Sequence, residues 1–379
     1  MKRTLLVTID FPPMFGGVAN YWANLCRCMP SDSFVVLAQE YDNSLDFDIK
    51  QNYLIYRKNL ISNNKWLWPK WLPLLYQTYK LIRSENIKKL VVGHVLPTGT
   101  VAYILKKLLR VPYLVSIHGL DIAIAQQNKR KKWLMRKVFS QAEKIITNSN
   151  YTKEQLLKLD CCVKDDVVVV YPCPNKTLGK GSEEFKQRVF QNNNLQNKKI
   201  ILTVGRLVER KGHDKVIEAM PEILEKIPNA VYIIVGQGKQ LSDLKTKAEE
   251  IQVKDKVLFF TDMMDNELPT FYELADVFIM PSRQLANGDV EGFGIVYLEA
   301  NIYAKPAIAG KSGGAVEAVE HNLNGLLVDP LNINEISQAI VSVLENQTKA
   351  KELGERGRER VIEKFNWEKQ AAELVKILS

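Results

Sequence analysis

Short runs of β-branched and aliphatic residues alternate with longer helical patterns along most of the 379-residue chain, and this alternation constrains the fold more than any other feature. In the first half the runs are TLLVTI, VVGHV, YLVSI and KIITNS, and helical patterns follow at about 98–109 and 152–159. Such alternation indicates parallel strands with helices covering both faces of the sheet. We therefore expect an α/β protein with doubly wound sheets.

The alternation stops near Tyr171 and resumes at Lys199. The intervening stretch PCPNKTLGKGSEEFKQRVFQNNNLQNKK is polar and rich in Asn, Lys and Gly, which is typical of a connection between domains. The pattern then continues through KIILTVG, AVYIIVG, KVLFF, DVFIM, PAIAG and GLLV. Because the chain exceeds what one core usually supports, we predict two Rossmann-like domains, residues 1–175 and 176–365, and an amphipathic helix at about 366–379. Ligands of such sheets bind beyond the carboxyl ends of the strands, so two facing domains would bracket an interdomain cleft.

The segment GDVEGFGIVYLEA carries the strongest functional signal. Glycines let the backbone approach a ligand, and the N–H groups at a helix start form an anion site, so Phe293, Gly294 and Ile295 would direct their N–H groups at a phosphate. Glu291 precedes this helix, and Glu299 would lie about 8 Å further along its axis at about 1.5 Å per residue. The two carboxylates could accept hydrogen bonds from two sugars, as the hexose–diphosphate–ribose layout of a nucleotide sugar requires.

Polar or glycine-rich loops follow three other predicted strands. GRLVERKG places Arg206 and Lys211 after IILTV. The planar guanidinium of an arginine and the compact ammonium of a lysine together suit a pyrophosphate. Gly16 and Gly17 follow the first strand, and His118 follows YLVSI. Taken singly, these residues also fit a solvated charge, a tight turn and a structural histidine.

Together these segments resemble glycosyltransferase family four, especially its phosphatidylinositol mannosyltransferases and related bacterial mannosyltransferases. The resemblance rests on GGVA, the His118–Gly119 pair, GRLVERKG, and DVEGFGIVYLEA followed by GKSGGAVEAV. These motifs extend from residue 16 to residue 317 and so cover nearly the whole chain. The resemblance implies the GT-B fold, with an N-terminal acceptor domain, a C-terminal nucleotide-sugar domain, and a last helix that packs back on the first domain.

The resemblance also implies residue roles. Glu291 would hold hydroxyl groups of the transferred hexose, Glu299 would hold the ribose, and cations with helix-start N–H groups would neutralise the diphosphate. The implied donor-binding set is Arg206, Lys211, Met263, Glu291, Phe293, Gly294, Ile295 and Glu299. From the N-terminal domain, the implied set is Gly16, Gly17 and His118, with the glycines against the phosphate and the histidine beside the sugar.

The implied reaction is hexosyl transfer with retention of anomeric configuration, in which the departing phosphate oxygen takes the acceptor's proton, without metal or cofactor. The likeness of residues 289–299 favours GDP-mannose as donor, and UDP-glucose and UDP-N-acetylglucosamine remain open, as do a lipid and a glycan acceptor. A sugar-nucleotide epimerase of similar fold and a non-catalytic sugar-binding protein are the alternatives. Asp46-Phe47-Asp48 resembles a metal-holding Asp-x-Asp, but it lies in a polar stretch with no strongly apolar strand directly before it, so we expect no metal there.

Charge is distributed unevenly along the chain. The first 180 residues carry 27 Lys and Arg against 13 Asp and Glu, a balance of +14, whereas the remainder carries 25 against 30. An anionic partner for the N-terminal half follows from this excess. Residues 57–83 and 129–139 interleave basic residues with tryptophans, which suits an anionic bilayer surface and equally suits solvated helices that pack their tryptophans inward. Nucleic acid could use the same charge, but we do not expect it as a partner.

No stretch approaches the roughly 18 apolar residues needed to cross a bilayer, and the apolar run at the N-terminus is too short for a secretory signal. The five cysteines lack zinc-site spacing and fit free thiols in a reducing compartment. We therefore expect a cytoplasmic protein, with peripheral attachment to the inner face of the plasma membrane as one possibility.

Overall fold

The computed structural model describes residues 2–14, 16–119, 128–175 and 179–379. It divides into two compact units, Met1–Pro172 with Trp367–Ser379, and Cys173–Asn366. The sequence placed the first boundary three residues later, after residue 175. Each unit is described separately below.

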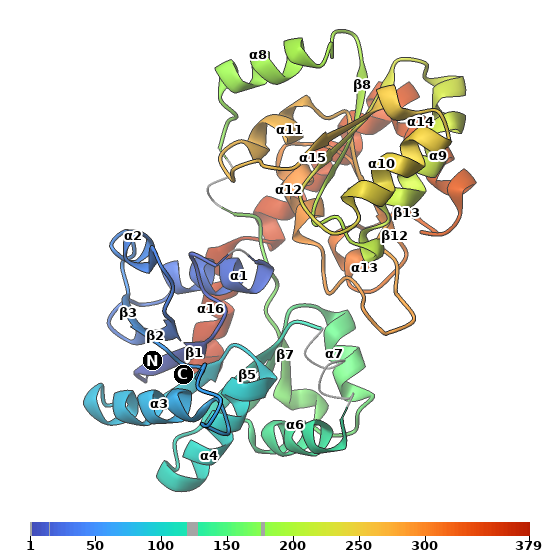
Figure 1. The fold of residues 1–379 in the computed structure, drawn as a ribbon. Helices are drawn as coiled ribbons and strands as arrows, with labels where there is room; N and C mark the ends of the chain where they lie inside the picture. Colours follow the sequence, from blue (N-terminus) through green and yellow to red (C-terminus); the bar gives the residue numbers. More distant parts are fainter. Residues whose placement is uncertain (1, 15, 120–127, 176–178) are drawn as a thin grey trace. The chain divides into compact units, whose positions relative to one another are not determined.

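The described residues of the N-terminal unit form a seven-stranded parallel sheet in the order β3-β2-β1-β4-β5-β6-β7 (Figure 1). Its strands are β1 (Thr4–Thr8), β2 (Phe34–Gln39), β3 (Leu54–Lys58), β4 (Lys89–Val92), β5 (Tyr113–Ile117), β6 (Lys144–Thr147) and β7 (Val167–Val169). Its helices are α1 (Gly17–Arg27), α2 (Ser44–Asp48), α3 (Leu72–Ser84), α4 (Thr100–Leu109), α6 (Lys129–Gln141), α7 (Asn150–Leu157) and α16 (Trp367–Leu378). The chain order reverses at β1, whose Leu6 pairs with Val36 on one side and with Val91 on the other.

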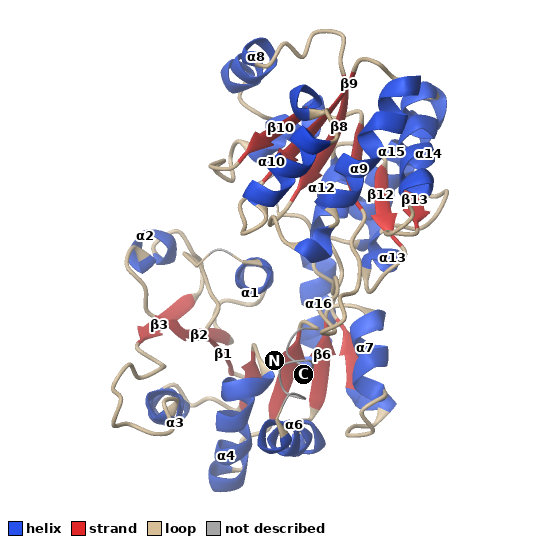
Figure 2. Ribbon diagram, turned by 45° about the vertical axis from the view of Figure 1, so that its right-hand side comes forward, coloured by secondary structure: helices blue, strands red, loops and turns tan. Residues whose placement is uncertain are grey.

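Helices cover both faces of this sheet. Helix α4 contacts α3 and α6 on one face, and α1 contacts α16 on the other (Figure 2). The first face buries Leu81 of α3, Leu105 of α4 and Val138 of α6 against strand residues such as Val92 and Val115. The Asp-x-Asp stretch forms the short helix α2, where Asp48 pairs with Arg57 at 2.7 Å.

The last helix, α16, belongs to the N-terminal unit although the chain reaches it through the other unit. Trp367 is buried and its ring meets that of Tyr21 edge-on at 5.8 Å. The side chain of Gln370 accepts a hydrogen bond from the Tyr171 backbone N–H at 2.8 Å. The amphipathic pattern at the end of the sequence thus packs its apolar side on α1.

The described residues of the C-terminal unit form a six-stranded parallel sheet in the order β10-β9-β8-β11-β12-β13. Its strands are β8 (Lys199–Val204), β9 (Ala230–Val235), β10 (Val257–Phe260), β11 (Val277–Met280), β12 (Ala307–Gly310) and β13 (Gly325–Val328). Its helices are α8 (Glu183–Asn192), α9 (His213–Lys226), α10 (Leu241–Glu250), α11 (Leu268–Leu274), α12 (Ile295–Ile302), α13 (Ala315–Ala318), α14 (Ile333–Glu345) and α15 (Gln347–Lys364). Strand β8 lies at the point where the order reverses, so loops after β8 and β11 occupy the place where such sheets bind ligands.

Candidate active site

Three charged side chains meet after β8 and β11 in the C-terminal unit. Lys211, in a short 3-10 turn, donates a hydrogen bond from Nζ to Glu291 Oε2 at 2.5 Å. Arg210 Nη1 donates to the same oxygen at 2.7 Å, and Arg210 Nε lies 3.1 Å from Asp289 Oδ1. The side chains of Arg210, Lys211 and Glu291 are 8%, 11% and 12% exposed. Two cations therefore hold one carboxylate in a site that largely excludes water.

The cations keep this carboxylate ionised. Burial alone would raise the pKa of Glu291, but the charges of Lys211 and Arg210 and their hydrogen bonds lower it to about 2. Burial lowers the pKa of Lys211, and the charge of Glu291 opposes that shift. The pair is thus stabilised in its charged form by mutual attraction, which is strong where water is excluded.

Glycines allow the loop of Glu291 to pack tightly. Gly294 has φ +91°, and a Cβ there would lie 2.4 Å from Cε2 of Tyr297. Gly314 donates its backbone N–H to Glu291 O at 2.8 Å, and a Cβ there would lie 2.0 Å from Gly292 O. The GFG and SGG segments therefore need glycine because backbone meets backbone or an aromatic ring at these points.

Helix α12 starts directly after this loop. Gly294 caps it, Ile295 is its first residue, and Phe293 is buried beside it. The first N–H groups of a helix have no partner within the helix and carry a partial positive charge. A phosphate at this end would meet both those N–H groups and the cations around Glu291.

Glu299 lies on the same helix and is held by a tyrosine. Tyr272 of α11 is fully buried and donates a hydrogen bond from its hydroxyl to Glu299 Oε2 at 2.7 Å. The ring of Tyr272 stacks on Tyr303 at 5.6 Å with an interplanar angle of 6°. Burial raises the pKa of Glu299 to about 6, while the Tyr272 hydrogen bond and the charge of Lys211 lower it. Glu299 therefore lies within electrostatic reach of the Lys211–Glu291 pair.

Arg206 and Met263 occupy loops at the same sheet edge. Arg206 follows β8, its side chain is exposed, and its charge lowers the pKa of Lys211. The buried ring of His213 at the start of α9 lies 3.2 Å from the Arg206 backbone oxygen, through Nε2. Met263 is half-buried in the loop after β10. The predicted donor residues of this unit are thus distributed over loops that follow β8, β10 and β11, with Ile295 and Glu299 on α12.

A second polar cluster lies at the carboxyl ends of neighbouring strands in the N-terminal unit. Asp10 follows β1 and its Oδ2 lies 3.0 Å from Nε2 of His94, which follows β4. His118 follows β5, and its ring lies 6.4 Å from that of His94 and 5.2 Å from that of Tyr21. The hydrogen bond with His94 lowers the pKa of Asp10, and burial lowers the pKa of His118 to about 3. His118 is therefore a neutral imidazole at physiological pH.

The two glycines after β1 stand in open space. Gly17 is the first residue of α1, and Gly16 caps it in an extended conformation. A Cβ at either position would meet no atom within 4 Å. Neither glycine is required by packing within the described residues.

Family models of known proteins match the two units separately. The model named Glycosyltransferase Family 4 matches residues 15–175, and the model named Glycosyl transferases group 1 matches residues 185–360. The chain belongs to glycosyltransferase family 4. It is therefore an enzyme that transfers a sugar, and the epimerase and the non-catalytic sugar-binding alternatives are set aside.

Characterised relatives of this glycosyltransferase span its full length. It is 29% identical over 382 residues to the GDP-mannose-dependent alpha-(1-6)-phosphatidylinositol monomannoside mannosyltransferase of Mycobacterium tuberculosis, covering 100% of this chain and 98% of that protein. A GDP-mannose-dependent monoacylated alpha-(1-6)-phosphatidylinositol monomannoside mannosyltransferase of Corynebacterium glutamicum is 28% identical, with the same coverage. The predicted resemblance to this group of mannosyltransferases is thereby confirmed.

A solved structure confirms the predicted GT-B fold class. The glycosyltransferase matches HepE of Anabaena in complex with UDP with a TM-score of 0.82, at 18% identity, covering 100% of this chain and 99% of that one. At this identity the match shows the fold alone.

Sequence reasoning missed several polar residues of this glycosyltransferase's two clusters. Arg210 directly precedes the predicted donor-binding residue Lys211 in ERKG, and this position was the only feature of the sequence that could have indicated a role for it. Asp10 and His94 follow the strand runs TLLVTI and VVG, which is the criterion that selected His118. Tyr272 lies in a helix and carries no local signal, because only the fold brings its hydroxyl to Glu299.

Proposed function

We propose that this glycosyltransferase transfers mannose from GDP-mannose to a lipid or glycan acceptor, with retention of anomeric configuration and without a catalytic metal. The observation that carries the proposal is the buried Arg210–Lys211–Glu291 cluster at the start of α12. The mannosyltransferases of Mycobacterium tuberculosis and Corynebacterium glutamicum, similar over their whole length, support the donor. Their phosphatidylinositol monomannoside acceptors support a lipid acceptor at the cytoplasmic face of a membrane.

In the proposed mechanism, the bond between the anomeric carbon and the diphosphate oxygen breaks while the acceptor hydroxyl forms a new bond on the same face. Negative charge then grows on the diphosphate, where Lys211, Arg206 and the first N–H groups of α12 stabilise it. Fixed donors of this kind are typically worth about 3–4 kcal/mol each in the transition state. The departing phosphate oxygen takes the acceptor's proton, so atoms balance without an enzyme nucleophile.

Two carboxylates position the donor in this proposal. Glu291 accepts hydrogen bonds from hydroxyl groups of the hexose, and its salt bridges with Arg210 and Lys211 fix its orientation. Glu299 accepts hydrogen bonds from the ribose. His118, as a neutral imidazole, donates or accepts a hydrogen bond beside the sugar, and Met263 contacts the base.

The test is a donor panel. The purified enzyme is incubated with GDP-mannose, UDP-glucose or UDP-N-acetylglucosamine and a phosphatidylinositol monomannoside acceptor, and thermal shifts are recorded for each nucleotide sugar without acceptor. A ligand at about 100 times its dissociation constant adds about 2.7 kcal/mol of stability. The proposal predicts a shift and product with GDP-mannose, an α-anomeric linkage by NMR, and turnover that persists in excess EDTA. A β-linked product, or turnover abolished by EDTA and restored by a divalent cation, would contradict it.

A UDP-sugar is the second candidate donor. The fold match to HepE, whose structure contains UDP, favours this alternative. A thermal shift with UDP-glucose and none with GDP-mannose would establish it and would leave the roles of the charged cluster unchanged.

A further inference from the structure

The loop before α3 exposes large aromatic side chains. Trp66 and Trp68 are 95% and 81% exposed, whereas Trp71 in the same loop packs partly against the core. Exposing two indole rings to water is unfavourable unless something covers them, because each ring carries a large apolar area. Tryptophan is enriched where proteins meet the headgroup region of a bilayer, since the ring is apolar and its N–H needs a polar partner.

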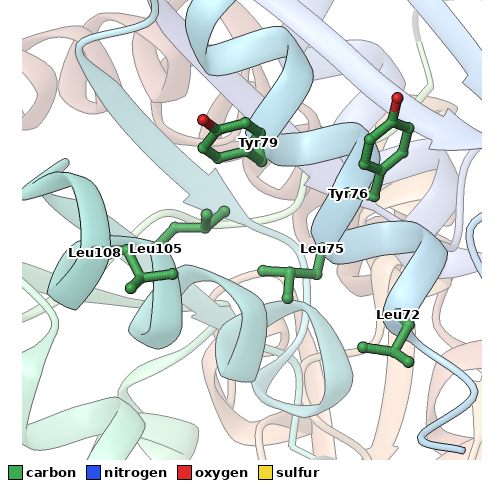
Figure 3. Close-up of a pocket in the computed structure, with 6 residues that line it drawn as sticks. All are labelled: Leu72, Leu75, Tyr76, Tyr79, Leu105 and Leu108. Atoms are coloured by element: carbon green, nitrogen blue, oxygen red, sulfur yellow. The ribbon is translucent and has the colours of Figure 1, made fainter.

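An apolar groove lies on the same helix layer. It has a volume of about 370 Å³ between α3 and α4 and is lined by leucines and tyrosines only (Figure 3). The lining residues are Leu72, Leu75, Tyr76, Tyr79, Leu105 and Leu108. Tyr76 and Leu108 are 62% and 68% exposed, so the groove opens to the outside of the unit.

Positive charge is concentrated on the helices of this layer. Helices α3, α4 and α6 carry ten Lys and Arg residues and no Asp or Glu. These residues are Lys80, Arg83, Lys106, Lys107, Lys129, Arg130, Lys131, Lys132, Arg136 and Lys137. Helix α16, on the opposite face of the sheet, carries two acidic and two basic residues. The basic excess of the N-terminal half is therefore concentrated on this helix layer.

Cations and aromatic rings alternate on the layer. Lys107 lies over the ring of Tyr103 at 4.8 Å, and Arg83 lies over that of Tyr79 at 5.8 Å. On α6, Lys137 lies 6.0 Å from the ring of Trp133, which is 59% exposed. Long basic side chains can thus keep their charges at headgroup level while the rings enter the apolar boundary.

We propose that the layer formed by α3, α4, α6 and the loop at 59–71 docks on an anionic phospholipid bilayer. The cations meet the lipid phosphates, Trp66 and Trp68 enter the boundary between headgroups and acyl chains, and the groove takes the end of an acyl chain. Charge complementarity selects this occupant: a ten-to-none excess of cations matches an anionic leaflet, and the groove and exposed indoles match its apolar layer. No helix in the described part of the chain is long and apolar enough to span a bilayer. This docking rests on the proposed function in one respect, since it would bring the enzyme to a lipid acceptor. Membrane binding is measured without donor or acceptor, so its failure can be distinguished from failure of the transfer reaction.

Vesicle co-sedimentation of the full-length enzyme tests the proposal. Vesicles of phosphatidylcholine are compared with equal mixtures of phosphatidylcholine and phosphatidylglycerol at physiological salt. Wild type should pellet with the anionic vesicles only. K131E/K132E on α6 should bind about 30-fold more weakly, since each cation near an anionic surface contributes about a fivefold factor. The matched control, K254E/K351E, changes two exposed lysines of the C-terminal unit and should bind like wild type.

The aromatic contribution needs its own pair of variants. W66A/W68A should weaken binding to anionic vesicles by a factor that high salt does not remove, because its origin is apolar burial. L331A, at a 62% exposed leucine of the C-terminal unit, is the control. Thermal melts check that each variant is folded.

Three results would overturn the proposal. They are failure of wild type to pellet with anionic vesicles, binding that K131E/K132E and K254E/K351E weaken equally, and binding unaffected by W66A/W68A. Tight binding of wild type to a short RNA with no vesicle binding would assign the surface to nucleic acid instead.

Discussion

Nucleotide binding should weaken as the pH falls through about 6, because Glu299 must be ionised to serve as an acceptor. Burial raises the pKa of this carboxyl to about 6. Two ribose hydroxyls that donate hydrogen bonds need acceptor oxygens, and protonation converts one of the carboxyl oxygens into a donor. Tyr272 already donates a hydrogen bond to Oε2 of Glu299, so a proton on this carboxyl group would leave too few acceptor sites for the ribose hydroxyls.

The size of the effect follows from the pKa. A carboxyl with a pKa of about 6 is about 90% ionised at pH 7 and about 10% ionised at pH 5, so an affinity that requires the carboxylate falls about tenfold, or about 1.4 kcal/mol. The free energy of unfolding depends on pH in the opposite direction from that of a protein stabilised by a salt-bridged acid. Because the folded pKa lies above the ordinary value of 4.5, the stability that protonated Glu299 contributes is present below about 4.5 and is lost as the pH rises through about 6.

Isothermal titration calorimetry with GDP and with UDP between pH 5 and pH 8 measures the prediction. Phosphate groups of a nucleotide also titrate at about pH 6, so the relevant quantity is the affinity of wild type relative to E299Q at each pH. That ratio should fall about tenfold from pH 7 to pH 5. In Y272F the midpoint should move upward, because the Tyr272 hydrogen bond lowers the pKa of Glu299. An affinity ratio that is independent of pH would refute the role of Glu299 as an ionised acceptor. If the midpoint of the pH dependence is the same in Y272F as in wild type, the Tyr272 hydroxyl does not affect the pKa of Glu299.

The remaining predictions concern the Glu291 loop. K211A should lower transfer by about 100-fold or more because it removes a cation that stabilises the leaving diphosphate, and E291A should do the same because it removes the carboxylate that positions the hexose; the circular dichroism spectrum should stay unchanged, and near-wild-type turnover in either would exclude its proposed role. G294A should lower the melting temperature more than G288A: both glycines have positive φ, but only at Gly294 would a Cβ meet an atom within 4 Å, on Tyr297, and equal shifts would contradict this steric argument. The pKa of Glu291 of about 2 lies below its ordinary value of 4.5, so the stability that it contributes is present above about 4.5 and should be lost as the pH falls towards 2; acid melts of E291Q should lack this loss.

Much of the fold could be predicted because its strands have strong local signals. All six strands of the C-terminal unit correspond to apolar runs singled out in the sequence. In the N-terminal unit, β2, β3 and β7 were not singled out, and β3 reads LIYRK, which has little apolar character because it lies at the edge of the sheet. Helix boundaries moved by about two residues, to Thr100 for α4 and Asn150 for α7, since helix ends depend on capping rather than periodicity.

The residues of the candidate site could be predicted only where a charged side chain lies in the loop directly after a strand. Glu291 and Lys211 belong to such loops, and the structure brings them into contact although 80 positions separate them. Arg210 could not be assigned from ERKG alone, because only the fold shows that the turn directs both Arg210 and Lys211 onto Glu291. Tyr272 could not be found, because its position is determined by how α11 packs beside α12.

The placement of α16 has a consequence for how the chain is made. Residues 173–366 interrupt the N-terminal unit, so a ribosome completes the whole second unit before it delivers the helix that finishes the first. Until then Tyr21 and the rest of α1 lack the cover that Trp367 and Leu374 provide. A premature stop codon at Trp367 would therefore damage the first unit, which was translated long before it, and leave the second unit intact.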